Sequence, residues 1–250
     1  MKRCHVLTLF PGFFSSPLSE TLLKRAREKG ALDVNLVDIR GFTEGRHKTA
    51  DDAPYGGGAG MVLKPEPIFR AVEFVRRSSQ SPLRVVLLSP QGKLFSQETA
   101  REYAESPRDL VLICGRYEGV DERVAGHLAD EELSIGDYVL SGGEAPALVV
   151  LEAVARLLPG VLGAEESARF DSFSEEGTLD HPHYTRPPEF EGMKVPDILL
   201  SGNHEEIRKW RRREALRKTL SVRPDLLARA RLTEEDRRLL AEIEGGLQTP

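Results

Sequence analysis

Three short stretches of the sequence end an apolar run on Gly, Ser or Pro, a pattern typical of ligand-binding turns. They read LLSPQG (87–92), ICGRYEGVDER (113–123) and IGDYVLSGGEAP (135–146). Glycine lets a ligand approach the backbone without meeting a side chain, and exposed backbone N–H and C=O groups can read the edge of an adenine ring. A single turn of this kind is more often an ordinary strand-to-helix connection. Three of them together favour a ligand pocket.

The residues beside these glycines argue against a polyphosphate ligand. Gly92 and Lys93 are followed by Leu94 rather than Ser or Thr, so this is no Walker motif. The stretch PYGGGAGM (54–61) has Met61 where a dinucleotide fingerprint needs glycine. It fits a flexible hinge and a mobile cover equally well. The remaining candidate is an adenosine ligand without polyphosphate, such as S-adenosylmethionine. A nucleotide hydrolase ranks last among the enzyme hypotheses.

Asp171 and Arg156 are two charged residues beside apolar neighbours, and the first is a candidate base. Asp171 lies between Phe170 and Phe173, where partial desolvation would make it a stronger base, although a solvated linker aspartate is the more ordinary interpretation. Arg156 lies on a strongly apolar helix, where it either needs a buried partner or reaches solvent. Metal binding by the H-x-H pair at 181–183 would need more ligands nearby, so we interpret the pair as part of a turn with incidental histidines.

The elements that must position these residues alternate between strand and helix over the first 160 residues. We expect strands at 5–10, 32–39, 84–88, 110–114 and 138–140, and helices over 17–29, 65–75, 96–105, 120–128 and 144–158. This alternation predicts an α/β fold with a mostly parallel sheet and helices on both faces. Because parallel strands end at one edge of the sheet, the three turns should meet there.

From residue 161 the pattern changes. Residues 161–180 are poor in apolar side chains and are interpreted as an interdomain linker or lid. Residues 181–250 predict a small C-terminal helical domain, with helices opening at Asn203, Pro224 and Thr233. The first of these helices carries a basic cluster, composed of Arg208, Lys209, Arg211, Arg212, Arg213, Arg217 and Lys218. It follows an acidic stretch within 165–180 and favours contact with a nucleic-acid backbone, although the net charge of the chain is −5.

Composition sets the remaining bounds. The 250 residues are 40% apolar, which is enough for a buried core, and no apolar run is long enough to span a membrane. The first residues predict a strand rather than a signal peptide. The two cysteines, Cys4 and Cys114, show no metal-ligand spacing and no disulfide framework, so we expect a cytoplasmic protein.

Seven stretches, taken together and in order, resemble the bacterial tRNA (guanine-N1)-methyltransferase (TrmD) family. They are PYGGGAGM, LLSPQGK, CGRYEGVDERV, SIGDYVLSGGE, RFDSF, PHYTRP and LLSGNHEEIRKWR. One departure is Leu87, where a tyrosine is common in the family, and we expect it to alter only packing against the cofactor. The resemblance implies a SPOUT-class fold with a trefoil-knotted cofactor site over residues 1–160. It also implies a homodimer with composite active sites, and methyl transfer from S-adenosylmethionine to N1 of guanine 37 in tRNA.

The same resemblance assigns roles to individual residues. Asp171 would be the general base and Arg156 its partner in handling the guanine, while Glu118 would lie near the methionine part of the cofactor. The implied cofactor-binding residues are Leu88, Ser89, Pro90, Gly115, Tyr117, Glu118, Ile135, Gly136, Asp137, Tyr138, Val139, Leu140, Gly142, Gly143 and Pro146. The family also suggests that Mg²⁺ assists, but no cluster in the sequence marks a metal site.

Two alternatives stay open at this point. One is a SPOUT-class methyltransferase acting on another RNA position, such as a ribose hydroxyl. The other is a non-catalytic RNA-binding module.

Overall fold

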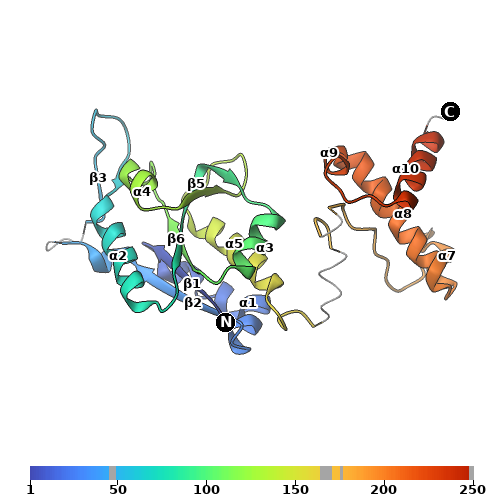
Figure 1. Cartoon of the computed structure of the whole chain (residues 1–250), viewed down its shortest axis with the longest axis horizontal. Coiled ribbons are helices and arrows are strands. Elements are labelled where there is room, and N and C mark those ends of the chain that lie inside the picture. Colours follow the sequence, from blue (N-terminus) through green and yellow to red (C-terminus); the bar gives the residue numbers. More distant parts are fainter. Residues whose placement is uncertain (45–48, 164–170, 175–176, 248–250) are drawn as a thin grey trace. The chain divides into compact units, whose positions relative to one another are not determined.

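The computed structural model describes residues 1–44, 49–163, 171–174 and 177–247 of the chain (Figure 1). The chain divides into two units, Met1–Gly163 and Ala164–Pro250. Of the acidic stretch expected within 165–180, Glu165, Glu166, Glu175 and Glu176 lie outside the described residues. Among the residues that are described, no helix combines the length and apolarity needed to cross a membrane.

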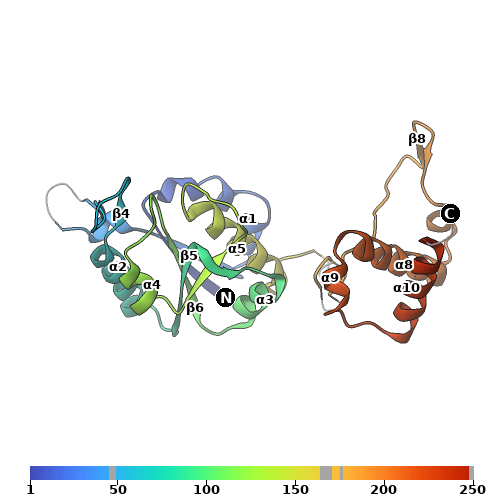
Figure 2. The same cartoon turned by 90° about the horizontal axis from the view of Figure 1, so that it is seen from above.

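A five-stranded parallel sheet forms the centre of the first unit (Figure 2). Its strand order is β2-β1-β6-β5-β7, and its strands are β1 (Lys2–Thr8), β2 (Leu32–Asp38), β5 (Leu83–Leu94), β6 (Asp109–Cys114) and β7 (Glu131–Ser134). Every pairing between neighbours is parallel. All six residues of β6 are buried, as expected for a central strand covered on both faces. The predicted parallel α/β sheet is confirmed.

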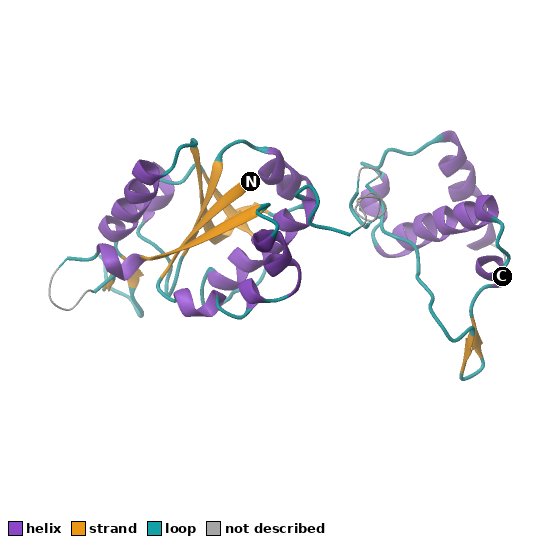
Figure 3. Ribbon diagram, turned by 90° about the horizontal axis from the view of Figure 1, so that it is seen from below, coloured by secondary structure: helices purple, strands orange, loops and turns teal. Residues whose placement is uncertain are grey.

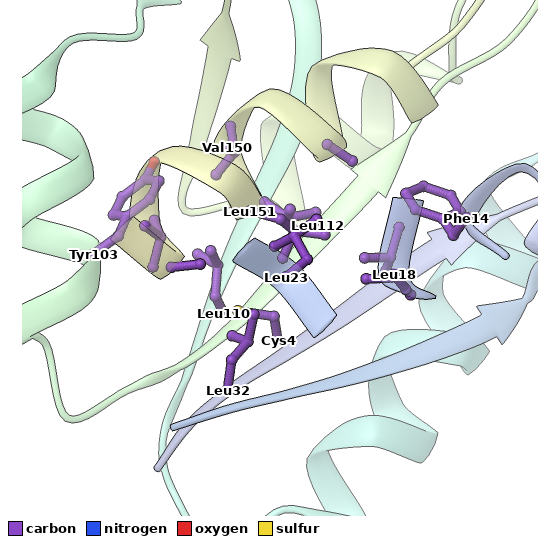
Figure 4. Close-up of a cluster of buried hydrophobic side chains, with 14 of the residues drawn as sticks. Cys4, Phe14, Leu18, Leu23, Leu32, Tyr103, Leu110, Leu112, Val150 and Leu151 are labelled. Atoms are coloured by element: carbon purple, nitrogen blue, oxygen red, sulfur yellow. The ribbon is translucent and has the colours of Figure 1, made fainter. Parts of the chain in front are cut away.

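Helices cover both faces of this sheet (Figure 3). Helices α1 (Thr21–Glu28), α3 (Gln97–Glu105) and α5 (Glu144–Leu157) lie on one face, and α2 (Pro65–Ser78) and α4 (Glu122–His127) on the other. Successive residues of a strand point to opposite faces, so Leu110 and Leu112 pack with α5 (Figure 4), whereas Val111 and Ile113 pack with α2. Short 3₁₀ turns and a two-stranded ribbon complete the unit, at η1 (Pro11–Phe14), η2 (Pro17–Ser19), η3 (Ile39–Phe42), β3 (Asp51–Asp52) and β4 (Val62–Leu63).

The strand predicted at 138–140 is wrong. The fifth strand is instead β7, and residues 138–140 form an exposed part of the loop that follows it. The sequence hid β7 because it begins with two glutamates. The structure places Glu131 between Arg84, whose Nε donates to it at 2.6 Å, and the hydroxyl of Tyr103 at 3.0 Å.

Two further predictions need correction at element ends. Residues 89–92, expected as a turn after the strand at 84–88, lie within the bounds of β5 but are not paired with β7, since Leu133 lies opposite both Leu88 and Lys93. The helix expected over 17–29 is split into η2 and α1, and the Ser16 side chain forms no capping hydrogen bond.

The second unit is built on a pair of helices, α8 (His204–Val222) and α10 (Glu234–Leu247). The other elements are β8 (Glu189–Phe190), β9 (Met193–Lys194), α7 (Asp197–Leu200) and α9 (Pro224–Leu227). The predicted capping by Asn203 is confirmed, since its side chain accepts a hydrogen bond from the Glu206 amide at 3.3 Å. The Thr233 hydroxyl likewise accepts from the Asp236 amide at 3.2 Å at the start of α10.

A buried ion pair joins these two helices. Arg212 Nε and Nη2 lie 2.6 and 2.9 Å from the carboxylate oxygens of Asp236, whose side chain is 3% exposed. Arg212 therefore does not belong to a solvent-facing basic surface. Arg208, Lys209 and Arg217 also form ion pairs with nearby glutamates. The expected basic cluster is thus partly neutralised within the unit.

Candidate functional site

A cavity of about 410 Å³ opens at the carboxyl ends of β5, β6 and β7. Open parallel sheets bind their ligands at this edge. The cavity volume lies within the range of roughly 300–1,000 Å³ that is typical of pockets for small molecules. Its walls come from residues 87–91, 115–120 and 132–136 and from the turn before α5. The sequence-predicted residues in the lining are Leu88, Ser89, Pro90, Gly115, Tyr117, Glu118, Ile135, Gly136, Tyr138, Val139, Leu140, Gly142, Gly143 and Pro146. Asp137 is exposed and lies outside this lining.

Two glycines of these turns face other backbone segments rather than open space. A Cβ on Gly143 would lie 2.6 Å from Cys114 Cα, and the Gly143 amide donates to the Gly115 carbonyl at 2.9 Å. A Cβ on Gly92 would lie 2.3 Å from the Leu133 amide nitrogen. Glycine is needed there because two chain segments cross at backbone contact.

We expect Gly143→Ala to lose about 1–3 kcal/mol of stability, because the added methyl forces apart the two segments that shape the cavity. We also expect it to lose the cofactor binding that the family resemblance implies for this cavity. Calorimetric titration with S-adenosylmethionine and denaturant unfolding measure the two effects. Gly126→Ala is the matched control, since a Cβ there meets nothing within 4 Å. Wild-type affinity in Gly143→Ala would show that this crossing does not shape the cavity.

The glycine-rich stretch 56–61 is anchored to the cavity wall at its end. The Glu118 amide donates to the Met61 carbonyl at 3.0 Å, and the Leu63 amide donates to the Gly119 carbonyl at 3.0 Å. A Cβ on Gly60 would lie 2.4 Å from a carboxylate oxygen of Glu118. These contacts place the end of the stretch against the cavity wall, although residues 54–61 are not among those that line the cavity.

Sequence analysis missed a buried network behind the cavity. Glu144 at the start of α5 is 1% exposed, and it accepts hydrogen bonds from the Thr8 hydroxyl at 2.7 Å and from Arg116 Nε at 2.9 Å. Arg116 Nη1 also donates to the Ser141 carbonyl at 3.1 Å, and its guanidinium lies 4.6 Å from the ring centroid of Phe10. Arg116 therefore ties the turn after β6 to the turn before α5. The only sequence signal was a glutamate opening a mainly apolar helix.

The cysteine at the end of β6 is unsuited to nucleophilic chemistry. Burial raises the pKa of the Cys114 thiol well above its ordinary value, and the nearby Glu144 carboxylate raises it further. The thiol stays protonated at neutral pH, so the reactivity of this cavity depends on other groups.

The two residues to which the family resemblance assigns catalytic roles lie in different units. Arg156 is exposed in the last turn of α5, in agreement with a side chain that reaches solvent. Asp171 is half-buried and belongs to the second unit. Of its flanking aromatics, Phe173 is 42% exposed and Phe170 lies outside the described residues.

Asp180 joins the two histidines of the H-x-H pair. Its carboxylate oxygens lie 2.6 Å from His181 Nδ1 and 2.9 Å from His183 Nε2, and the three ligand-type atoms lie within 4.8 Å of one another. Burial raises the pKa of Asp180, but hydrogen bonds from His183 and His181 outweigh it and the pKa is lowered. Burial lowers the pKa of His181. The structure thus brings the carboxylate of Asp180 to the two histidines as a third ligand-type group.

A parallel sheet with a glycine-lined cavity at its carboxyl edge makes this an α/β protein of the kind that binds ligands at the ends of its strands. The family model described as tRNA (Guanine-1)-methyltransferase TrmD matches residues 1–229, and the chain belongs to this family. Among curated relatives, the tRNA (guanine-N(1)-)-methyltransferase of Geobacillus kaustophilus is 57% identical over 242 residues, covering 97% of this chain and 98% of its own. Proteins of the same name from Dehalococcoides mccartyi and Moorella thermoacetica are each 55% identical, covering 96% and 99% of this chain and 96% and 100% of their own.

Proposed function

We propose that this protein is an enzyme that transfers the methyl group of S-adenosylmethionine to N1 of guanine 37 in tRNA, next to the anticodon. Family membership over residues 1–229 and relatives of the same printed activity at 55–57% identity support this function. The observation that carries it is the cavity, because its lining contains nearly every residue that the family resemblance assigns to the cofactor.

The cavity has the chemistry that the adenosine part of the cofactor requires. Its walls combine apolar side chains such as Leu88 and Leu140 with backbone polar groups of glycine turns, and both phosphate-binding motifs are absent from the sequence. Glu118 supplies a carboxylate for the positively charged methionine end. When bound, the cofactor supplies an electrophilic methyl group, so the protein has to position the guanine and move one proton.

Asp171 is proposed to move that proton. Guanine N1 carries a hydrogen and is a poor nucleophile until a base removes it. The carboxylate of Asp171 accepts the N1 proton as the methyl group transfers. The guanidinium of Arg156 stabilises the negative charge that develops toward O6.

A trefoil knot at the cofactor site is proposed on the same grounds. The close approaches of Gly92 to Leu133 and of Gly143 to Cys114 agree with the crossing of chain segments in such a knot. A homodimer with composite sites agrees with the exposed apolar rim of the cavity, where Tyr138 and Val139 are 55% and 88% exposed.

The remaining assignments follow from the proposed reaction. Residues 1–160 would bind the cofactor, residues 161–180 would connect the two domains, and residues 181–250 would bind the tRNA. The reaction would take place in the cytoplasm. Within the basic cluster, Arg211 and Lys218 are exposed and suit a phosphate backbone. Assistance of the methyl transfer by Mg²⁺ is proposed from the family resemblance alone.

Methyl-labelled S-adenosylmethionine, incubated with the protein and tRNA carrying G or A at position 37, tests this function. Mass spectrometry of the digested tRNA should find 1-methylguanosine only with G at position 37. Label on a ribose oxygen would instead identify a ribose methyltransferase. Calorimetric binding of tRNA without binding of the cofactor would identify a non-catalytic RNA-binding module.

A further inference from the structure

The segment that carries Asp171 is hydrogen-bonded to helix α8. The Leu179 amide donates to the Thr219 hydroxyl at 3.0 Å, and Arg212 Nη1 donates to the Thr178 hydroxyl at 3.2 Å. Thr219 is fully buried and Thr178 is 4% exposed. These bonds are therefore shielded from water, and they fix the end of the segment on the helical unit.

A second set of hydrogen bonds runs back from this anchor to Asp171. The Phe173 amide donates to the Thr178 carbonyl at 2.9 Å, and the Asp180 amide donates to the Ser172 hydroxyl at 3.0 Å. Ser172 is the residue next to Asp171. The two residues that follow Asp171, Ser172 and Phe173, are thus hydrogen-bonded to residues 178–180, and these in turn are hydrogen-bonded to α8.

The interior of α8 makes this anchor stiff. The Thr219 hydroxyl donates to the Ala215 carbonyl at 2.7 Å, which directs an oxygen lone pair toward the Leu179 amide. Arg212 is held in turn by the buried carboxylate of Asp236. A Cβ on Gly177 would lie 3.3 Å from Ala230 Cα, so the segment also packs closely against the chain after α9.

We propose that Ser172 and Thr219 are positioning residues that set the Asp171 carboxylate for catalysis, so that the base is carried by the helical unit rather than by the cofactor-binding unit. The inference rests on the proposed function of Asp171. Its physical reason is that a proton acceptor must meet N1 within hydrogen-bonding distance, and a misplacement of about 1 Å can cost about 100-fold in rate. A tRNA held by the helical unit then meets a base already fixed in the same unit.

The test compares Ser172→Ala and Thr219→Val with wild type in single-turnover methyl transfer at saturating cofactor and tRNA. We expect the rate to fall about 10- to 100-fold, with the dissociation constants for S-adenosylmethionine and tRNA unchanged. Thr219→Ser should restore the rate, because serine keeps the hydroxyl that accepts from Leu179. The control is Ser174→Ala in the same segment, since the Ser174 side chain forms no hydrogen bond with any residue that the structure describes.

A Ser172→Ala rate equal to that of Ser174→Ala would overturn the inference, as would a defect confined to tRNA affinity. If Thr219→Val does not fold, Ser172→Ala decides alone. Asp171→Ala is measured beside them. If it retains the wild-type rate, the proposed base itself is wrong. If it is inactive while Ser172→Ala is normal, only the positioning role is wrong.

Discussion

Asp171→Ala is expected to bind S-adenosylmethionine with wild-type affinity and to transfer methyl groups about 10²- to 10⁴-fold more slowly. The cofactor affinity should persist because the cavity is lined by residues of the first unit, to which Asp171 does not belong. The rate should fall because guanine N1 keeps its proton without an acceptor. Calorimetry measures the first effect and single-turnover kinetics the second.

Asp197→Ala is the control for this variant, since it removes an exposed carboxylate from the same unit at the start of α7. It should leave the transfer rate unchanged. Near-normal turnover by Asp171→Ala would refute the assignment of the base. An equal loss in both variants would indicate a general effect of charge.

Asp236→Asn is expected to lower the free energy of unfolding of the helical unit by about 3 kcal/mol at pH 7. Its carboxylate pairs with Arg212, whose side chain is only 15% exposed, so the substitution removes the negative charge that Asp236 places beside a buried guanidinium. Denaturant unfolding, followed by the fluorescence of Trp210 on the adjoining helix, measures the difference. Glu234→Gln on the same helix is the control, because its ion pair with Arg237 is solvent-exposed and such pairs contribute about 0–1 kcal/mol.

The pH dependence of this difference has a definite sign. Burial raises the pKa of Asp236, but hydrogen bonds from Arg212 and from the Thr233 amide outweigh it, and the pKa lies below the ordinary value of 3.8. A carboxyl group with a lowered pKa stabilises the folded state above its unfolded pKa and loses that contribution as the pH falls through its folded pKa. Wild type and Asp236→Asn should therefore differ at neutral pH and converge below pH 3.8. Equal stabilities at pH 7 would contradict the role of this pair.

Elements with strong local signals could be predicted from the sequence. Helix α5 was recognised from its continuous apolar pattern, and α8 from its capping residue Asn203. The strand β7 was missed because Glu131 is satisfied by Arg84 and Tyr103, which are distant in sequence. The apolar run at 138–140 was mistaken for a strand because its side chains form the exposed rim of a cavity rather than part of the core.

The candidate site also has features that the local sequence reveals and contacts that it does not. Its glycine turns were visible because each interrupts an apolar run. The contact between Thr8, Arg116 and Glu144 joins positions up to 136 residues apart, and no local pattern announces it. The roles of Asp171 and Arg156 came from family resemblance, since the local sequence of each fits ordinary solvent exposure as well as a catalytic role.

A crystal structure of the protein with a non-reactive analogue of S-adenosylmethionine and its tRNA tests the central claim most directly. We predict the adenosine in the cavity at the carboxyl ends of β5, β6 and β7, and an Asp171 carboxylate oxygen within hydrogen-bonding distance of guanine N1. An empty cavity, or a guanine whose N1 meets another group while Asp171 faces solvent, would contradict the account.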